Sequence, residues 1–200
     1  MMTVIKNLAD IPVVLASGSP RRIEILQNVG IDPIIIKPEC KEDLHVDLTP
    51  SQTVMALALR KAMCVEITEE CKALDDYLLI SCDTVVSFEG EVLGKPVSEY
   101  DAFSMLDKMN GKMNSVFSGV CLKRKNGRRE LFYDCSNVYF KPYGKQEIIA
   151  YVATGEPMDK AGAYAIQGGF SAYCEKVEGS FNNVVGLPIE RIRAVLSKGF

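Results

Sequence analysis

The residues that build metal and redox sites are scarce in this sequence. One histidine, His45, occurs among 200 residues, and the seven cysteines show no Cys-x-x-Cys spacing. Zinc sites are usually built from closely spaced cysteines and histidines, so this composition argues against zinc. Scattered cysteines, odd in number, are typical of reduced thiols in a cytoplasmic protein, several of them filling the core.

Long apolar runs and excess positive charge are also missing. No apolar run approaches the roughly 20 residues of a membrane span, and the formal net charge is −3. A negative balance argues against a surface that coats nucleic acid, although a small polyanion needs only local positive charge. The first ten residues show neither an apolar signal core nor an arginine-rich amphipathic pattern. We therefore expect a cytoplasmic protein without a membrane or nucleic-acid partner, folded as one domain over residues 1–200.

What is present begins with an apolar run that ends at the string Ser17-Gly18-Ser19-Pro20-Arg21-Arg22. The pattern predicts a strand, a tight turn and a helix, with the Ser19 hydroxyl as the N-cap acceptor and Pro20 at the first helical position. Free amides, hydroxyls and two guanidiniums at a helix N-terminus favour a phosphate. A capped helix with two solvated arginines is the alternative.

A second candidate is a carboxylate inside an apolar run. Residues 78–86 are typical of a buried strand, and Asp83 interrupts them. A buried carboxylate is costly unless a cation, a metal or a hydrogen-bond donor compensates it; an aspartate that closes a turn at a strand end is the alternative. Thr49 and Gln52 predict a capping box that starts a helix, and Lys61 interrupts its apolar face. Such a lysine usually snorkels at the rim of a core.

Other patterns place the remaining elements. Gly90-x-x-x-Gly94-Lys95-Pro96 is one residue short of a P-loop and has proline where serine or threonine is required, yet Lys95 can approach a phosphate as a point charge. The basic cluster within residues 123–129 is interpreted as a solvated hairpin tip. We expect a strand at 34–36 beside 13–16, hairpins with tips at 89–91 and 125–127, strands at 114–123 and 130–141, and helices at 20–30, 100–110, 145–153 and from 188.

Four strings together resemble the Maf family of nucleotide pyrophosphatases: Ser17–Leu26, Asp83–Val86, Asp159–Gly169 and Gly179–Pro188. The similarity runs from Val13 to Leu196. It implies an α/β fold like that of inosine-triphosphate pyrophosphatases, with an elongated mixed β-sheet, flanking helices and a cleft between two lobes. It also implies a homodimer that hydrolyses a nucleoside triphosphate to the monophosphate and pyrophosphate.

The resemblance further implies the site residues. Asp83 is expected to be catalytic, and Asp83 with Glu42 to hold a divalent metal, Mg²⁺, Mn²⁺ or Co²⁺; Glu39 and Asp43 are rivals to Glu42. Lys61 is expected to be a site lysine rather than a rim lysine. The substrate-binding residues implied are Ser17, Ser19, Arg21, Arg22, Lys61, Thr84, Lys95, Lys160 and Gln167.

Arg21, Thr84 and Gln167 match the branch of the family that prefers dTTP and UTP, and a glutamine amide can pair with the O/N–H edge of a pyrimidine. House-cleaning of modified pyrimidine nucleotides is the role that this suggests. A nucleotide-binding regulator of cell division, without turnover, is the alternative; Asp83 disfavours it because a carboxylate repels phosphate unless a metal intervenes. A serine hydrolase built on Ser17 or Ser19 would need a base, and only His45 is available.

Overall fold

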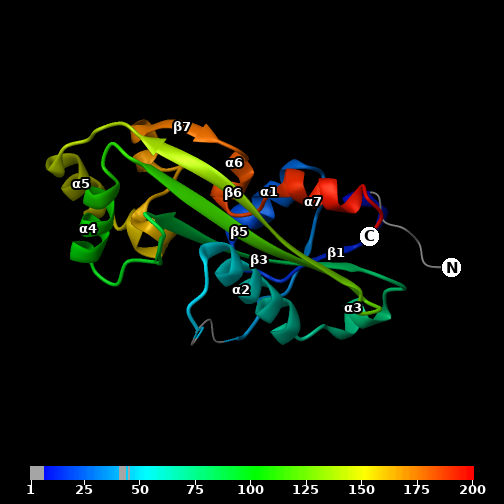
Figure 1. Cartoon of the computed structure of the whole chain (residues 1–200). Helices are drawn as coiled ribbons and strands as arrows, with labels where there is room; N and C mark the ends of the chain where they lie inside the picture. The colour runs from blue at the N-terminus through cyan, green and yellow to red at the C-terminus, as the bar shows by residue number, and fades with distance from the viewer. Residues whose placement is uncertain (1–6, 41–43, 45) are drawn as a thin grey trace.

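The computed structural model describes residues 7–40, 44 and 46–200. They fold around one seven-stranded mixed sheet with strand order β2-β1-β3-β5-β6-β7, in which β4 pairs with β3. The strands are β1 (Val13–Leu15), β2 (Ile34–Ile35), β3 (Leu78–Phe88), β4 (Glu91–Leu93), β5 (Met113–Arg124), β6 (Arg129–Phe140) and β7 (Cys174–Glu178). The sheet runs the length of an elongated molecule (Figure 1), which confirms the predicted α/β class and elongated mixed sheet.

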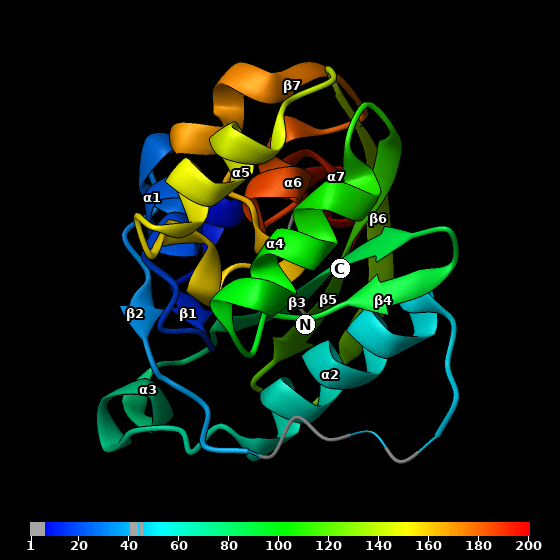
Figure 2. The same ribbon diagram turned by 90° about the vertical axis from the view of Figure 1, so that its left-hand side faces the viewer.

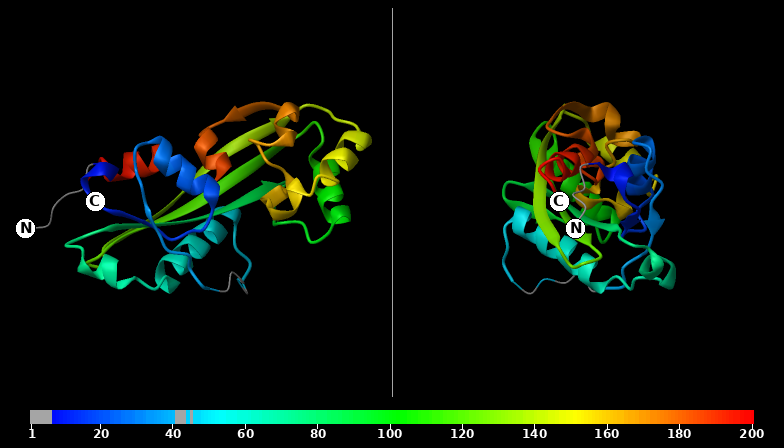
Figure 3. Two further views of the ribbon diagram at one scale, coloured as in Figure 1. Left: turned by 180° about the vertical axis from the view of Figure 1, so that it is seen from behind. Right: turned by 90° about the vertical axis from the view of Figure 1, so that its right-hand side faces the viewer.

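Helices cover both faces of this sheet. They are α1 (Pro20–Asn28), α2 (Pro50–Cys64), α3 (Glu69–Ala73), α4 (Glu99–Met109), α5 (Lys145–Val152), α6 (Phe181–Val185) and α7 (Ile189–Leu196), with short 3₁₀ turns η1 (Leu8–Asp10), η2 (Glu156–Asp159), η3 (Ala161–Ala163) and η4 (Gly169–Tyr173). Helix α2 lies on one face of the sheet, and α1, α6 and α7 lie on the other; both views in Figure 3 show this arrangement. Helices α4 and α5 lie at the end that faces the viewer in Figure 2. Among the described residues, no helix is both long and apolar enough to cross a membrane.

Strand β3 is the centre of the sheet, and its two edges differ. One edge pairs antiparallel with β5 along residues 78–87. The other edge pairs with β1 at residues 78–80 and with β4 at residues 86–88. Within the described chain, residues 81–85 therefore have no strand partner on this second edge. This stretch, which we call the open edge of β3, contains Asp83.

Helix α2 packs unusually close to β5 because residue 119 is a glycine. A Cβ atom at Gly119 would lie 2.3 Å from the backbone carbon and oxygen of Val54. The Ser81 hydroxyl also donates to the Ala58 carbonyl at 2.7 Å. The capping box of Thr49 and Gln52 forms as predicted. The contacts of Gly119 and Ser81 fix α2 on the face formed by β5 and β3.

The apolar core lies on both sides of the open edge. Cys82 belongs to a buried cluster under α1 and α7, and Val86 belongs to a second cluster under α4 and α5. Ile166 packs against both clusters. A third buried cluster, with Leu79, Ala58 and Cys121, lies on the α2 face of the sheet, the face to which the Asp83 side chain points. Asp83 itself is 7% exposed.

The basic hairpin tip is solvated as expected at Lys125, Arg128 and Arg129, and Arg124 is the exception. Arg124 is 4% exposed and forms an ion pair with Asp76, while its Nη1 donates to the Phe200 carbonyl at 3.2 Å. The Lys125 ammonium donates to the carbonyls of Lys72 and Leu74, at the end of α3. The cluster therefore ties the hairpin to α3 and to the C-terminal residue.

The Asp76–Arg124 pair should make stability depend on acid pH. Burial alone would raise the pKa of Asp76. Hydrogen bonds from the Arg124 side chain and from the Tyr77 N–H outweigh this effect and hold the pKa of Asp76 below its usual value. The stabilisation is therefore complete above about pH 4, the unfolded pKa, and is lost as pH falls through the lower folded pKa. We expect Asp76→Asn to lower the free energy of unfolding by about 2 kcal/mol at pH 7, with the difference from wild type closing below about pH 4.

Urea unfolding from pH 7 to pH 2.5 measures this difference. Glu69→Gln is the matched control, because the Glu69–Lys72 pair is exposed and such pairs contribute little. A gap between Asp76→Asn and wild type that stayed constant to pH 2.5 would contradict the assignment.

Candidate active site

The turn after β1 is organised by one arginine. Arg22 donates from Nε to the Gly186 carbonyl at 2.8 Å, from Nη1 to the Ser17 hydroxyl at 3.2 Å and from Nη2 to the Thr84 hydroxyl at 3.2 Å. The segments joined in this way are the β1–α1 turn, β3 and the connection from α6 to α7. Because a guanidinium has five N–H donors, two of them are not used by these bonds and can serve an anion.

The N-terminus of α1 differs in one detail from the prediction. Ser19 is the N-cap residue and Pro20 follows it, but the Ser19 hydroxyl makes no capping hydrogen bond. Instead the Ser17 hydroxyl accepts from the Ser19 N–H at 3.2 Å, two residues away. The Ser17 hydroxyl, which precedes the helix, is thus the oxygen that accepts an N–H at this turn. The Ser19 hydroxyl is left available to a ligand.

Lys61 and Asp83 form the second part of the site. Their Nζ and Oδ1 atoms lie 2.6 Å apart, and the side chains are 12% and 10% exposed. Lys61 lies on the α2 surface that Gly119 brings close to the sheet. The Lys61 ammonium turns inward to a carboxylate and does not reach out to solvent at a rim; its role as a site lysine stays a prediction.

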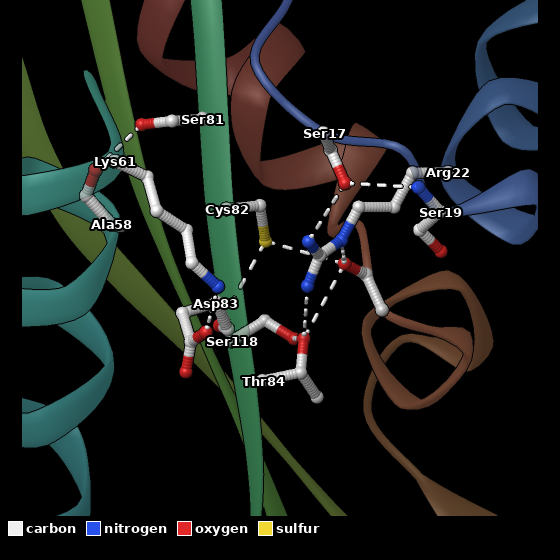
Figure 4. Close-up of polar contacts among 11 residues, drawn as sticks. Ser17, Ser19, Arg22, Ala58, Lys61, Ser81, Cys82, Asp83, Thr84 and Ser118 are labelled. Atoms are coloured by element: carbon white, nitrogen blue, oxygen red, sulfur yellow. Dashed lines mark hydrogen bonds and ion pairs between the residues drawn. The ribbon is translucent and has the colours of Figure 1, made fainter. Parts of the chain in front are cut away.

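Asp83 and Thr84 are consecutive in β3, so their side chains point to opposite faces of the sheet. Figure 4 shows this: Lys61 and Asp83 lie on the α2 side of β3, and Arg22 with Ser17 lies on the other side. The open edge of β3 is where a ligand can reach both faces, since no strand covers it there. The backbone groups of alternate residues in a strand point to the same edge. The Ile80 carbonyl accepts from the Ala16 N–H at 2.8 Å on this edge, so the backbone groups of Cys82 and Thr84 also point to it.

The string 159–169 also packs on β3. The Gly162 N–H donates to the Gly94 carbonyl at 3.0 Å, and a Cβ at Gly162 would lie 2.9 Å from the Val86 side chain. This contact places Lys95, the residue after Gly94, beside the segment that follows Lys160. Both lysines therefore belong to segments that border the end of the open edge.

Of the remaining predicted residues, Lys95 and Gln167 are exposed, whereas Arg21 and Lys160 are partly buried. Lys160 forms an ion pair with Asp159. The hydrogen bond from Lys160 lowers the pKa of Asp159, and the positive charge of Arg21 lowers it by a smaller amount. Arg21 thus lies within electrostatic range of that pair. Gln167 is exposed in the turn after η3. No hydrogen bond joins the side chains of Arg21, Lys95 or Gln167 to another described residue.

The structure also identifies polar residues that the sequence interpretation did not include. Ser118 of β5 lies 2.8 Å from the Thr84 hydroxyl, and the Cys82 thiol lies 3.2 Å from the Gly186 carbonyl that Arg22 also uses. Burial raises the pKa of Cys82, opposed by the charge of Arg22. The sequence around Ser118 gives only a weak signal of a functional role. Ser118 is seen to lie opposite Thr84 only when the pairing of β3 with β5 is known.

The described residues can contribute to a divalent cation but do not enclose one. Asp83 Oδ2 accepts no hydrogen bond within the described chain, and no group of three histidine, cysteine or acidic residues gathers there. One carboxylate oxygen fits Mg²⁺, which is commonly held by one or two carboxylates and by substrate phosphates. Glu42 and its rival Asp43 lie outside the described residues, and Glu39 is exposed.

The surroundings of Ser17 do not provide a base. Its described polar partners, the Arg22 guanidinium and the Ser19 N–H, are donors, so neither can take the hydroxyl proton. His45, the histidine that a serine hydrolase would require, lies outside the described residues.

Comparison with known proteins identifies the family of this chain. Residues 12–199 match the family model described as Maf-like protein. The chain belongs to the Maf family. It is 48% identical over 189 residues to a dTTP/UTP pyrophosphatase of Caldicellulosiruptor saccharolyticus, covering 93% of this chain and 94% of the relative. It is 41% identical over 180 residues to a dTTP/UTP pyrophosphatase of Bacillus thuringiensis, covering 90% and 91%. The Maf assignment thus extends over both halves of the site.

Solved structures give more distant matches. The Ham1 protein of Staphylococcus aureus is 13% identical with a TM-score of 0.45, covering 94% of this chain and 98% of that protein. A dITP/XTP pyrophosphatase of Mycobacterium abscessus is 12% identical with a TM-score of 0.39, covering 65% and 74%.

Proposed function

We propose that this Maf protein hydrolyses nucleoside triphosphates, with a preference for dTTP and UTP, to the monophosphate and pyrophosphate. The observation that carries the proposal is the pairing of Lys61 with Asp83 on one side of the open edge, opposite the Arg22 cluster. Relatives 48% and 41% identical over nine tenths of the chain bear the name dTTP/UTP pyrophosphatase, which supports the substrate class.

The cationic groups bind the triphosphate. The two unused N–H groups of Arg22, the Ser19 hydroxyl and the free amides at the α1 N-terminus face an anion with little reorganisation, because Ser17, Thr84 and Gly186 already hold the guanidinium. The ammonium groups of Lys95 and Lys160 add positive charge at the border of the same edge. These groups neutralise charge on the phosphates and on the leaving pyrophosphate.

Asp83 supplies the reactive carboxylate. Lys61 engages Oδ1, so Oδ2 is the atom that serves the reaction, as a metal ligand or as acceptor of the water proton. Mg²⁺, Mn²⁺ or Co²⁺ bound by Asp83, with Glu42 as the second proposed ligand, would neutralise phosphate charge and acidify water. The water oxygen bonds to the α-phosphorus, and the bond from that phosphorus to the α–β bridging oxygen breaks.

Arg21, Thr84 and Gln167 are proposed to select the base. Gln167 is exposed and its amide is unused within the described chain, so it can offer both a donor and an acceptor to a pyrimidine edge. A homodimer, cytoplasmic in location, that removes pyrimidine nucleotides, including modified ones, is part of the same proposal.

Gln167→Ala should relax base choice more than it slows hydrolysis. One base-specific hydrogen bond corresponds to about a tenfold ratio, so we expect the kcat/KM preference for UTP over CTP to fall about tenfold while the rate with CTP changes little. Steady-state kinetics with both nucleotides measures the ratio. Gln146→Ala, on the exposed side of α5, is the control. Equal losses for both nucleotides would contradict the role of Gln167.

The test of the proposed function is pyrophosphate release from a panel of nucleoside triphosphates, with Mg²⁺, Mn²⁺, Co²⁺ or EDTA. Metal-dependent release from dTTP and UTP, with the monophosphate as co-product, is the expected result. Release mainly from purine nucleotides would leave the reaction and overturn the base preference. Nucleotide binding without any release would instead favour the regulatory alternative, which otherwise leaves Asp83 without a purpose.

A further inference from the structure

A line of oxygen atoms behind Arg22 leads away from the ligand side of the site. The Thr84 hydroxyl, which accepts from Arg22 Nη2 at 3.2 Å, lies 2.8 Å from the Ser118 hydroxyl. Ser118 in turn donates to the Asn183 carbonyl at 3.1 Å. Figure 4 shows Ser118 behind Thr84 on the strand next to β3. Ser118 is fully buried, so its hydroxyl exchanges no hydrogen bonds with bulk solvent.

Counting protons limits this line to two arrangements. A hydroxyl has one proton, a carbonyl can only accept, and either hydroxyl could donate in the contact between Thr84 and Ser118. The arrangement that uses the shorter contacts gives the Ser118 proton to the Asn183 carbonyl at 3.1 Å, and Thr84 then donates to Ser118. Thr84 has then used its own proton and presents only lone pairs to Arg22. The longer alternative, from Thr84 to the Gly186 carbonyl at 3.4 Å, is not made at the same time.

We propose that Ser118 is a positioning residue of this enzyme: by taking the Thr84 proton, it turns the lone pairs of Thr84 to Arg22 and so fixes the guanidinium that binds the triphosphate. This inference rests on the proposed function for its kinetic consequence, while the orientation of Arg22 can be measured without it. The register of β3 against β5, with Thr84 opposite Ser118, is the structural basis.

The far end of the line is rigid. Asn183 is fully buried in α6, and its Nδ2 donates at 2.9 Å to both the Val116 carbonyl and the Ser136 hydroxyl. Its N–H donates to the Ser180 hydroxyl at 3.0 Å. Oδ1 of Asn183 has no hydrogen-bond partner in the described chain, so this side chain is kept in a buried place despite a cost of about 1–3 kcal/mol. The acceptor that sets the direction of the line is therefore fixed by β5 and β6.

Without the Ser118 hydroxyl, the Gly186 carbonyl at 3.4 Å is the one acceptor left to the Thr84 hydroxyl among the described residues. That carbonyl already receives Arg22 Nε at 2.8 Å and the Cys82 thiol at 3.2 Å. The Thr84 proton would then compete with Arg22 for the same oxygen. We expect Ser118→Ala to raise KM for UTP about tenfold, the size of one hydrogen bond, and to change kcat by less than twofold, because Arg22 holds the phosphates in both ground and transition states.

The test compares Ser118→Thr with Ser118→Val, which have nearly the same volume and differ in the hydroxyl. The KM of Ser118→Val for UTP should be about tenfold higher than that of Ser118→Thr, whose KM should stay near the wild-type value. Both variants add a methyl group at a buried position. Ser115→Ala is the control on the same strand, since the Ser115 hydroxyl bonds to Asn137 and not to the site. Thermal unfolding reports on any loss of fold separately from KM.

The second readout is the ¹⁵N–¹H signal of Arg22 Nε, measured without nucleotide. Slow hydrogen exchange of this group in wild type and Ser118→Thr, and faster exchange in Ser118→Ala and Ser118→Val, is the expected result. Equal exchange rates and equal KM values for Ser118→Thr and Ser118→Val would overturn the positioning role. An absence of pyrophosphate release in wild type would overturn the proposed function instead, and the Arg22 signal would still decide the role of Ser118.

Discussion

Asp83→Asn should lower kcat by about a thousandfold or more while nucleotide binding survives. The substitution keeps the shape of the side chain but removes the charge that holds a cation or takes a proton, and such groups contribute about 10²–10⁴-fold. Arg22, Lys95 and Lys160 remain, so the triphosphate still meets positive charge. Removing the Asp83 charge also removes a repulsion of the phosphates, so metal-free affinity for dTTP should be kept or raised.

Two measurements separate these effects: pyrophosphate release with metal, and calorimetric titration of dTTP in EDTA. Asp134→Asn is a suitable control, because Asp134 is a half-buried carboxylate on β6 whose pKa is raised by burial and which has no contact with Lys61. Near-native turnover by Asp83→Asn would show that the central role assigned to Asp83 is wrong. Loss of dTTP binding together with turnover would assign Asp83 to the fold instead.

Much of the fold could be predicted because local signals were strong. Glu89 and Gly90 both adopt positive φ at the β3–β4 hairpin, as the two central residues of a type I′ turn do. Gly127 does the same between β5 and β6. Strand β2 lies beside β1 as expected from its β-branched run, and the pairing is parallel. The expectation that this strand is buried was wrong, because Ile35 at the sheet edge is 49% exposed. These elements follow from turn chemistry and apolar periodicity within a few residues.

Other elements had weak local signals. Strand β7 has the sequence Cys-Glu-Lys-Val-Glu and lies on the sheet edge with mostly exposed side chains, so no apolar run marks it. Helices α3 and α6 have five residues each, and each begins with a hydroxyl cap that only a tertiary setting can distinguish from a turn. Arg124 was interpreted as solvated because its partner, Asp76, is 48 residues away in the sequence.

The site shows the same division between what is local and what is not. The residue types at Arg22, Lys61 and Asp83 could be predicted from motifs, and a buried carboxylate requires a partner on physical grounds alone. Which partner it has depends on Gly119, whose missing side chain lets α2 approach the sheet. Arg22 and Asp83 lie on opposite faces of β3 because side chains alternate along a strand. A ligand at the open edge can reach both faces, and no single sequence motif contains both Arg22 and Asp83.

Arg22→Lys should lower kcat/KM about a hundredfold, although the positive charge is kept. The guanidinium meets Gly186, Ser17 and Thr84 with three differently directed N–H groups and keeps two more for the ligand. An ammonium has three donors in all and no planar fork, so it cannot hold these acceptors and a phosphate together. Two charge-assisted hydrogen bonds at about 1.5 kcal/mol each correspond to roughly that factor. Arg22→Met should be more severe, because the charge is lost as well.

Arg21→Lys provides the matched comparison at the adjacent position. Arg21 donates no hydrogen bond to a described residue and acts on Asp159 only through its charge, which lysine retains. We therefore expect less than a fivefold change in kcat/KM for Arg21→Lys, about one weak hydrogen bond. Steady-state kinetics with UTP measures both variants, and thermal unfolding checks that each is folded. A change of less than fivefold at both positions would mean that charge alone matters at this turn, and that the fork geometry around Arg22 does not contribute to catalysis.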